Sequence, residues 1–465
     1  MSQVKSVVDV NGVRYELAEL IGRGGQGCVY AVKGGRLAVK VLRGRGTQHQ
    51  DHMRNQLIHV RRLPLGELSI AKPLEMLRQP HTGYVMELLT GMIPIKHLLS
   101  PPTGQVPNVE WYLRSGGLRQ RLVLLGRVAH ILSQLHGKGL AYSDPSPANI
   151  FISEDPSCSE VWLIDTDNLR YESAPGPLAA VCTPGYGAPE LVQNQSGVTT
   201  LTDAYSFAII AFQVLTLAHP FIGDLVNSGE PELEERAFSG HLPWIEDTED
   251  TSNRASFGIP RKWVLSPRLE EAFRMTFCDG RLTPSARPGV SEWAHRLLAA
   301  ADATLSCKSC DGSFYFNQAH CPWCDTPRPA YGVADFHLWD PTAGEGGVIK
   351  KPLQGSNMPK VVARSVLTSS KPFTITRRLA FGQMGPGAEE PVLKVLLNNA
   401  KLSLNSLDGN RYQIDLPSGG AQATISEKPR NLTLGEGQTL LNLHFGDKSC
   451  LHRVLHLNLK RGKKQ

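Results

Sequence analysis

Between residue 14 and about residue 95, apolar and polar positions alternate in short runs that are typical of β-strands. The runs YELAELIGRGGQGCVYAV, RLAVKVL, SIAKPLEML and GYVMELL predict strands, and the first of these is two strands joined by a glycine turn. A helix is expected from Asp51 to Leu63, where residues 53, 57 and 60 are apolar at helical spacing. The pattern therefore predicts a small lobe of strands around one helix.

Longer apolar stretches at helical spacing follow this lobe. They predict helices over residues 118–137 and 202–218, and near residues 268–277 and 290–303, with loops rich in Pro and Gly between them. A break follows near residue 304. We therefore expect one domain over residues 1–303, with an N-terminal lobe at about 14–90 and a larger helical lobe at about 91–303.

The pattern changes again after this break. Residues 304–326 contain four cysteines, and residues 327–360 are rich in Pro and Gly and are expected to be a linker. Residues 361–465 return to short alternating runs, such as AKLSLNSL and RYQIDL, separated by turn residues. Such runs predict an all-β, sandwich-like domain, for which a binding role is the default interpretation. The fold class expected for the whole chain is α+β.

Composition agrees with a globular protein of several domains. Of the 465 residues, 41% are hydrophobic and 20% are charged, which leaves enough apolar side chains for a sizeable core. The net charge of +6 is too weak to indicate a nucleic-acid partner. The longest apolar stretch, about residues 204–218, is too short and too polar to cross a bilayer, and no signal peptide is apparent. Neither a nucleic-acid nor a membrane partner is expected, and the expected location is cytoplasmic.

Four of the nine cysteines form two C-x2-C pairs, CKSC and CPWC, separated by ten residues. Each short loop can turn two sulfurs toward one ion, and four thiolates close a tetrahedral shell. The spacing therefore predicts a structural zinc site, with four reduced buried thiols as the alternative. The expected ligands are Cys307, Cys310, Cys321 and Cys324. The other five cysteines are scattered, which fits a reducing compartment.

The stretch GRGGQGCVY places Gly22, Gly24 and Gly27 in the order G-x-G-x-x-G. A dinucleotide-binding turn has this spacing but opens a helix, whereas residues 28–32 are β-branched and aromatic and predict a strand. A glycine turn between two strands can lay backbone N–H groups over phosphates. Lys40 follows in the apolar strand LAVKVL, where a lysine is costly to bury unless it is paired. We expect it to bind phosphate oxygens; the alternative is a lysine that reaches solvent from an edge strand.

Two further stretches, AYSDPSPANIFIS and VWLIDTDNLRY, carry candidate catalytic residues. Asp165 ends an apolar strand, and its carboxylate together with the amide oxygen of Asn149 forms a hard oxygen pair suited to Mg²⁺ between phosphates. Asp144 would orient an attacking hydroxyl and accept its proton. The pattern therefore predicts phosphoryl transfer.

The order of these motifs, followed by CTPGYGAPELV, resembles the eukaryotic-type (Hanks-type) serine/threonine protein kinases over roughly residues 14–303. The resemblance implies a bilobal kinase fold that uses ATP and Mg²⁺ and phosphorylates Ser/Thr hydroxyls of a protein substrate. It also implies that Thr183 lies against Asp144 and that Arg287 pairs with Glu190. The residues implied to contact ATP are Gly22, Gly24, Gly27, Val29, Ala38, Lys40, Met86, Glu87, Leu89 and Phe151.

Four positions depart from the family's pattern. Ser143 replaces an arginine that clamps a phosphorylated activation loop, so control by loop phosphorylation is not expected. Ser146 replaces a lysine near the transferred phosphoryl group, and Asp167 replaces the glycine of the D-F-G motif. Gln56 stands where the family offers a glutamate to the lysine that is here Lys40. These departures keep two alternatives open: a pseudokinase scaffold that binds ATP without transfer, and a small-molecule kinase of the same fold.

A kinase domain followed by a four-cysteine ribbon resembles the bacterial kinases associated with tellurium-resistance-type gene clusters. That resemblance implies a companion phosphatase and a von Willebrand A-type protein as partners. It gives no substrate for the kinase and no ligand for the C-terminal β domain.

Overall fold

The computed structural model describes residues 5–24, 27–43, 47–66, 68–101, 108–173, 182–342, 361–368, 372–384, 387–398, 401–415, 422–433 and 442–460. The chain divides into two compact units. The first consists of residues 1–116 and 120–296, and the second of residues 117–119 and 297–465. The basic tail after residue 460 lies outside the described residues.

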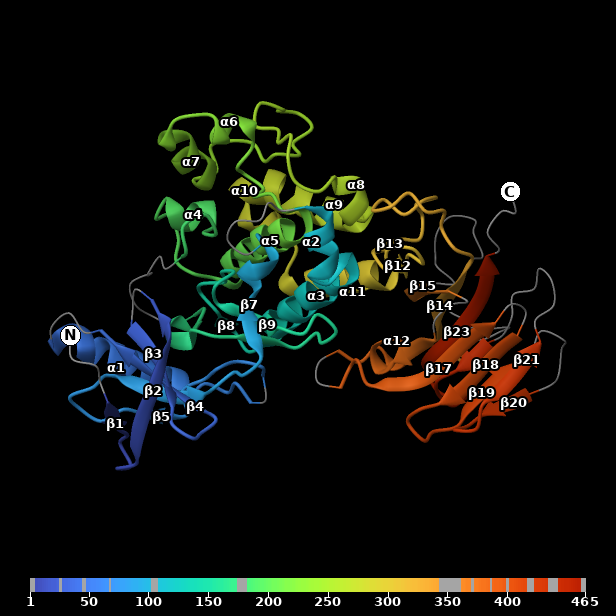
Figure 1. Ribbon diagram of the computed structural model, residues 1–465, viewed down its shortest axis with the longest axis horizontal. Helices are drawn as coiled ribbons and strands as arrows, with labels where there is room; N and C mark the ends of the chain where they lie inside the picture. The colour runs from blue at the N-terminus through green and yellow to red at the C-terminus, as the bar shows by residue number, and fades with distance from the viewer. Residues whose placement is uncertain are drawn as a thin grey trace. The chain divides into compact units, whose positions relative to one another are not determined.

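The first unit begins with a six-stranded antiparallel sheet in the order β1-β2-β3-β4-β6-β5 (Figure 1). The strands are β1 (Ser6–Val8), β2 (Arg14–Arg23), β3 (Gly27–Val32), β4 (Leu37–Leu42), β5 (Glu75–Met76) and β6 (Gly83–Glu87). β5 is much shorter than the run SIAKPLEML predicted, because Pro73 has no N–H to donate to a sheet.

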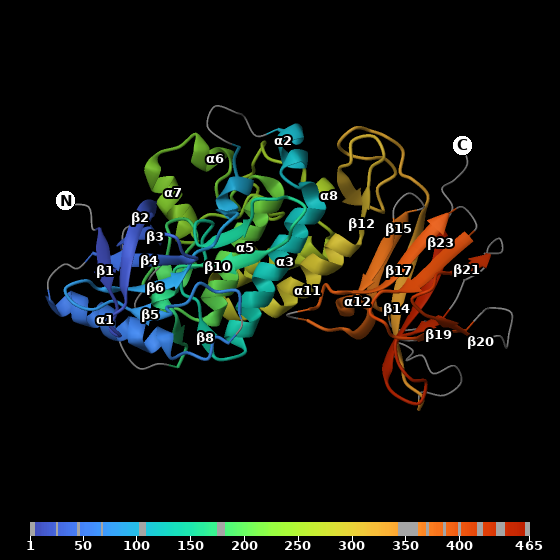
Figure 2. The ribbon, with the colours of Figure 1, turned by 60° about the horizontal axis from the view of Figure 1, so that its bottom comes forward.

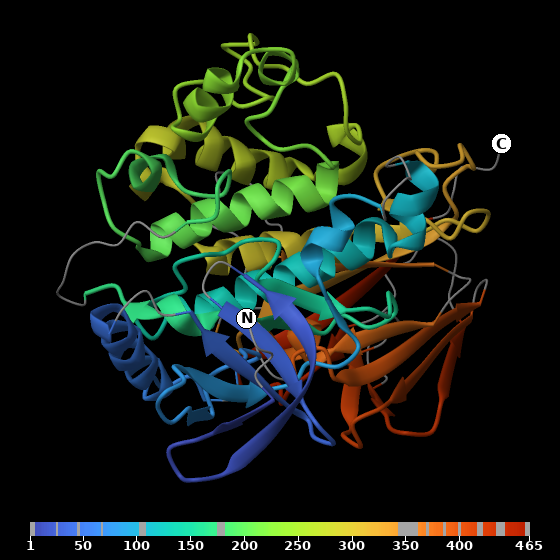
Figure 3. The same cartoon turned by 60° about the vertical axis from the view of Figure 1, so that its left-hand side comes forward.

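Helix α1 (Thr47–Arg61) lies beside this sheet (Figure 3). Its Leu57 is buried in one cluster with Leu42, Met76 and Tyr84 from three of the strands. The expected arrangement of strands around one helix is therefore present.

The rest of the unit is mainly helical and is built around α5 (Thr200–Thr216). Nearly all residues of α5 are buried, which explains why this segment has no polar face in the sequence. The other helices are α2 (Val109–Arg114), α3 (Gly117–His136), α4 (Pro189–Val192), α6 (Asp224–Asn227), α7 (Pro231–Phe238), α8 (Arg261–Val264), α9 (Pro267–Arg274), α10 (Gly280–Leu282) and α11 (Val290–Asp302), with single turns η1 (Ile95–Leu98), η2 (Thr166–Asn168), η3 (Met275–Asp279) and η4 (Pro284–Ala286). Among the described residues, no helix has the length and apolar character needed to cross a membrane.

Short strands hold the two loops that carry the candidate catalytic residues. Residues 142–149 connect β8 (Leu140–Ala141) to β9 (Ile150–Ser153), and residues 164–169 connect β10 (Val161–Leu163) to β11 (Arg170–Tyr171). β8 pairs with β11, and β9 pairs with β10 and with β7 (Met92–Pro94). Because the two loops begin and end on paired strands, they lie side by side.

The second unit contains the cysteine-rich segment and the C-terminal β domain. The cysteine-rich segment follows β12 (Thr304–Ser306), which pairs with β13 (Ser313–Tyr315). The β domain has a six-stranded sheet, β15-β14-β23-β22-β19-β20, and a four-stranded sheet, β16-β17-β18-β21 (Figure 2). Phe336 and Leu455 of the larger sheet share one buried cluster with Leu393 and Leu404 of the smaller sheet. The two sheets therefore pack face to face, as the alternating runs predicted.

The elements of this domain are β14 (Tyr331–Trp339), β15 (Val361–Thr368), β16 (Phe373–Thr376), α12 (Arg377–Phe381), β17 (Pro391–Asn398), β18 (Lys401–Ser406), β19 (Tyr412–Asp415), β20 (Gln422–Ile425), β21 (Arg430–Thr433), β22 (Asn442–His444) and β23 (His452–Lys460). β14 lies inside residues 327–360, which were expected to be a linker, so that prediction is wrong for this part. The Pro and Gly residues on either side indicated a linker, although Val333, Ala334 and Phe336 are buried positions of a strand. The run FTITRRL is likewise a strand followed by the short helix α12.

Candidate active site

The loop that carries Asp144 is held by Asp203 at the start of the buried helix α5. Asp203 Oδ2 accepts the backbone N–H of Tyr142 at 2.6 Å, and Oδ1 accepts that of Ser143 at 3.0 Å. His136 Nε2 lies 3.0 Å from Oδ2 of the same carboxylate. Ser143 has a φ of 82°, which a non-glycine residue rarely adopts, and the bond to Asp203 stabilises that conformation. Asp144 therefore projects from a rigid support.

The carboxylate of Asp144 is half-buried between Thr183 and Asn149. Its Oδ1 accepts the backbone N–H and the hydroxyl of Thr183, both at 2.8 Å. Asn149 Nδ2 donates to the carbonyl of Asp144 at 3.1 Å and to Oδ2 at 3.3 Å. Burial raises the pKa of Asp144, the negative charge of Asp165 adds to the rise, and the bonds from Thr183 and Asn149 oppose it. The two Thr183 bonds orient the carboxylate and leave Oδ2 the less occupied oxygen.

Lys40 is buried and forms ion pairs with two carboxylates. Its Nζ lies 2.6 Å from Asp165 Oδ1 and 2.6 Å from Asp167 Oδ2. Burial by itself lowers the pKa of Lys40, but the charges of Asp167 and Asp165 outweigh that effect and the pKa is raised. The lysine is therefore a charged group held in place, and it does not snorkel to solvent.

Sequence reasoning missed Asp167 as a partner of Lys40. Asp167 Oδ1 accepts the hydroxyl of Tyr84 at 2.7 Å, while Oδ2 faces the lysine. Gln56, which stands at the expected glutamate position, donates its Nε2 to the carbonyl of Leu169 at 3.1 Å. The only sequence signal was the second acid of IDTDN, which was interpreted solely as the loss of a glycine.

The oxygen donors near these carboxylates fit a magnesium ion. Asn149 uses its Nδ2 as the donor to Asp144, so its side-chain oxygen remains an acceptor. Its backbone carbonyl accepts the N–H of Ile164 at 2.9 Å, which places it beside the residue that precedes Asp165. The Asp165 side chain is about one-third exposed, so it is accessible to a cation. Carboxylate and amide oxygens are the ligands that Mg²⁺ prefers.

The glycine turn is built for close approach of two strands. A Cβ on Gly27 would lie 2.4 Å from the carbonyl oxygen of Val41, so only glycine fits there. Gly22 lies opposite Val29 in the β2–β3 pair, and the Gly24 N–H donates to the Gly27 carbonyl at 3.0 Å. Residues 25 and 26, at the tip of the turn, lie outside the described residues.

The residues expected to contact adenine lie on β4, on β6 and just after it, and on β9. Ala38, which is fully buried, faces Met86 across the β4–β6 pair, and Glu87 at the end of β6 is exposed. Leu89 follows β6 and is half-buried, and Phe151 lies on β9 opposite Trp162. Their contact with a nucleotide stays a prediction.

Glu190 and Arg287 form a bidentate ion pair. Arg287 Nη1 lies 2.6 Å from Glu190 Oε1, and Nη2 lies 2.8 Å from Oε2. The guanidinium also donates from Nε to the carbonyl of Gly280 at 2.6 Å and lies 4.7 Å from the ring centre of Tyr205. The pair that the kinase resemblance implied is therefore present, and it ties α4 to the loop before α11.

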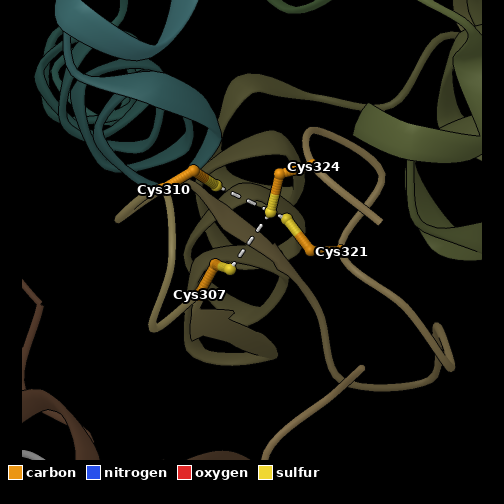
Figure 4. A group of neighbouring side chains, drawn as sticks. All are labelled: Cys307, Cys310, Cys321 and Cys324. Carbon is orange, nitrogen blue, oxygen red and sulfur yellow. Dashed lines mark hydrogen bonds between the residues drawn. The ribbon is translucent and has the colours of Figure 1, made fainter. Parts of the chain in front are cut away.

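The four cysteines of the two C-x2-C pairs converge on one point (Figure 4). All four sulfurs lie within 4.8 Å of one another, with 3.5 Å between Cys307 and Cys324 and 3.7 Å between Cys310 and Cys321. A tetrahedral zinc ion with Zn–S bonds of about 2.3 Å separates its sulfurs by about 3.8 Å. The geometry and the donor set fit zinc with all four ligand positions filled by protein.

The chain belongs to the protein kinase domain family, which matches residues 15–259, more than half of its length. It is 30% identical over 224 residues to the serine/threonine-protein kinase Pkn1 of Myxococcus xanthus, a match that covers 45% of this chain and 30% of Pkn1. It is 28% identical over 270 residues to the DNA damage-responsive serine/threonine-protein kinase RqkA of Deinococcus radiodurans, covering 55% of this chain and 37% of RqkA. The chain thus spans only about a third of the length of these two relatives.

Proposed function

We propose that this protein transfers the γ-phosphoryl group of ATP to Ser or Thr hydroxyls of a protein substrate. The observation that carries the proposal is the set of bonds around Asp144. Thr183 and Asn149 orient its carboxylate, and Asp203 holds the backbone before it. A carboxylate held in this way beside oxygen donors for Mg²⁺ is what phosphoryl transfer to a hydroxyl requires.

Asp144 would act as the general base. It would orient the substrate hydroxyl and take its proton on a carboxylate oxygen. The hydroxyl oxygen bonds to the γ-phosphorus as the bond to the departing ADP oxygen breaks. Asn149 and Asp165 would hold Mg²⁺, and Lys40 would bind phosphate oxygens. The metal, when bound, neutralises negative charge between the phosphates.

A protein substrate is favoured over a small molecule. Glu190 ends the sequence APE of residues 188–190 and is fixed by Arg287, and in the kinase family this segment shapes the protein-substrate groove. Relatives in two bacterial genera and in rice are named as protein kinases. The pseudokinase alternative is favoured by one observation, the replacement of the catalytic-loop lysine by Ser146, which is buried.

We propose that phosphorylation of the activation loop does not control this enzyme. Ser143 is buried and donates its hydroxyl to the carbonyl of Asn168 at 2.8 Å, so it links the two loops directly. In the family, the arginine at this position binds the phosphate of the activation loop. The bond from Ser143 to Asn168 needs no phosphate. The two loops would therefore be aligned before any modification.

We place a structural zinc ion at Cys307, Cys310, Cys321 and Cys324. None of the nine cysteines forms a disulfide, which supports a reducing compartment and hence a cytoplasmic protein. The order of kinase domain, cysteine cluster and β domain supports a companion phosphatase and a von Willebrand A-type protein as partners. These two partner proteins are the first candidates to test as substrates of the kinase.

The test is incubation of the full chain with γ-labelled ATP, Mg²⁺ and the candidate partner proteins, followed by phosphoamino-acid analysis. Phosphoserine or phosphothreonine on the chain or on a partner is expected. Label found only in a small-molecule product, or no transferred label at all, would contradict the proposal.

A further inference from the structure

We propose that Asp167 is the positioning residue for Lys40 and takes over the task that a helix-borne glutamate performs in protein kinases. The inference deepens the proposed function and rests on it in so far as Lys40 binds ATP. It implies that the lysine is held in place independently of helix α1.

The geometry gives Asp167 one partner for each carboxylate oxygen. Oδ2 lies 2.6 Å from Lys40 Nζ, and Oδ1 accepts the Tyr84 hydroxyl at 2.7 Å. Lys40 on β4 and Tyr84 on β6 face each other in the sheet register. The three side chains form a closed triangle in the interior of the unit, with relative exposures of 5% for Asp167, 6% for Lys40 and 0% for Tyr84. A buried charge in such a place is tolerated only when it is paired and hydrogen-bonded.

Asp165 and Asp167 are not equivalent partners of Lys40. Asp165 is about one-third exposed, and among the described residues Lys40 is the one hydrogen-bond donor to its side chain. Its carboxylate is thus able to turn toward a metal ion. Asp167 is fixed by Tyr84 as well as by Lys40 and is closed off from solvent. If Asp165 held a metal ion, Asp167 would still pair with Lys40 and keep it in position.

Helix α1 makes a different contact from the one its family position implies. In protein kinases the lysine–glutamate pair is made or broken by movement of the corresponding helix. Here Gln56 is uncharged and donates to the carbonyl of Leu169. The ion pair therefore connects the sheet to the loop of residues 164–169. Any control of Lys40 would act through that loop, which also carries the metal ligand Asp165.

The experiment compares Asp167→Asn with the parent protein. The variant keeps the size of the side chain and removes its charge, so Asp165 becomes the only anion beside Lys40. If Asp165 turned to a metal ion in this variant, Lys40 would lose its last anionic partner. We expect kcat to fall by about tenfold or more, the scale of a lost charge contact in a reacting site. The Mg²⁺ concentration for half-maximal rate should rise severalfold, with a smaller change in the KM for ATP.

A second-site variant separates positioning from general structural damage. Gln56→Glu added to Asp167→Asn supplies a carboxylate at the position where the kinase family carries its glutamate, and part of the lost kcat should return. Gln56→Glu alone removes the donor to the Leu169 carbonyl while Asp167 still holds Lys40, so the rate should not rise. Asp155→Asn, the same chemical change on an exposed loop, is the matched control and should behave as the parent. If Asp167→Asn does not fold, the same measurements are made on Tyr84→Phe, which removes the other hydrogen bond to Asp167. Its kcat and Mg²⁺ requirement should change in the same direction by a smaller amount.

The NMR signal of the Lys40 ammonium, recorded at one fixed pH, gives a readout that needs no activity. Asp167→Asn should shift this signal, because Nζ loses the carboxylate that lies 2.6 Å away, and Asp155→Asn should leave it at the parent position. If the parent transfers no phosphate but the signal shifts, the proposed function fails and the positioning role of Asp167 stands. An unshifted Lys40 signal together with an unchanged Mg²⁺ requirement would overturn the inference.

Discussion

Thr183 donates both its backbone N–H and its hydroxyl to one oxygen of Asp144, each at 2.8 Å. The two residues come from separate loops, so the bond pair fixes the activation segment to the candidate general base. It also acts on the charge of that base, because both bonds favour the ionised carboxylate and so lower its pKa.

This relationship predicts a pH effect. Asp144 must be ionised to accept a proton, so the rate is lost as the pH falls through its pKa. Burial raises that pKa, and the Thr183 bonds oppose the rise. Thr183→Ala removes the hydroxyl bond, so the acid limb of the kcat/KM profile should move to higher pH. Thr183→Ser keeps a hydroxyl and should leave the limb near its parent position. An acid limb unmoved by Thr183→Ala would show that Asp144 does not set it.

The Glu190–Arg287 pair predicts a stability effect. The Arg287 side chain is fully buried, so removing its partner leaves an uncompensated charge. Glu190→Gln should lower the free energy of unfolding by about 3 kcal/mol, measured by urea denaturation of the full chain. Arg287→Lys keeps the charge but loses the bidentate geometry, and it should also destabilise the fold. A change within about 0.5 kcal/mol for Glu190→Gln, as at ordinary surface sites, would contradict this account.

Regulation can be checked by dephosphorylation. Ser143 stands where the kinase resemblance implies an arginine, and its hydroxyl already donates to the carbonyl of Asn168. We therefore expect phosphatase treatment of the purified protein to change its rate little. The treated sample is compared with a mock-treated one after mass spectrometry has mapped its phosphosites. A large loss of rate on removing phosphate from Ser173 or Thr183 would mean that another cation does the work of the missing arginine.

The cysteine cluster predicts a bound metal. The purified chain should contain about one equivalent of zinc by elemental analysis, because four thiolates form a closed shell. The double variant Cys307→Ser, Cys324→Ser should lose the metal. Cys158→Ser changes an exposed cysteine outside the cluster and should keep it. A parent protein free of zinc would refute the assignment.

Sequence patterns predicted the elements whose signal is local. The apolar run of α5, the glycine turn before Cys28 and the two C-x2-C pairs all depend on neighbours in the chain. The second partner of Lys40 was not accessible in this way, because Asp167 lies 127 positions away in the chain. The register of β4 with β6 sets Tyr84 beside Lys40, and Tyr84 then fixes Asp167 there. β14 was missed for a related reason, since its buried positions are explained by pairing with the distant strand β23.

The central claim, that Asp144 serves transfer and Asp165 serves nucleotide binding, is tested most directly by comparing two variants. Mg²⁺–ATP affinity and the transfer rate are measured on the same samples of the full chain. Asp165→Ala should lose both. Asp144→Asn should bind Mg²⁺–ATP as the parent does, while its transfer rate falls by roughly 100-fold or more, the usual scale of general-base effects. The contrary result is a parent protein that binds Mg²⁺–ATP but transfers no phosphate, with Asp144→Asn indistinguishable from it. That result would contradict the claim that the protein is an enzyme and would identify an ATP-binding scaffold.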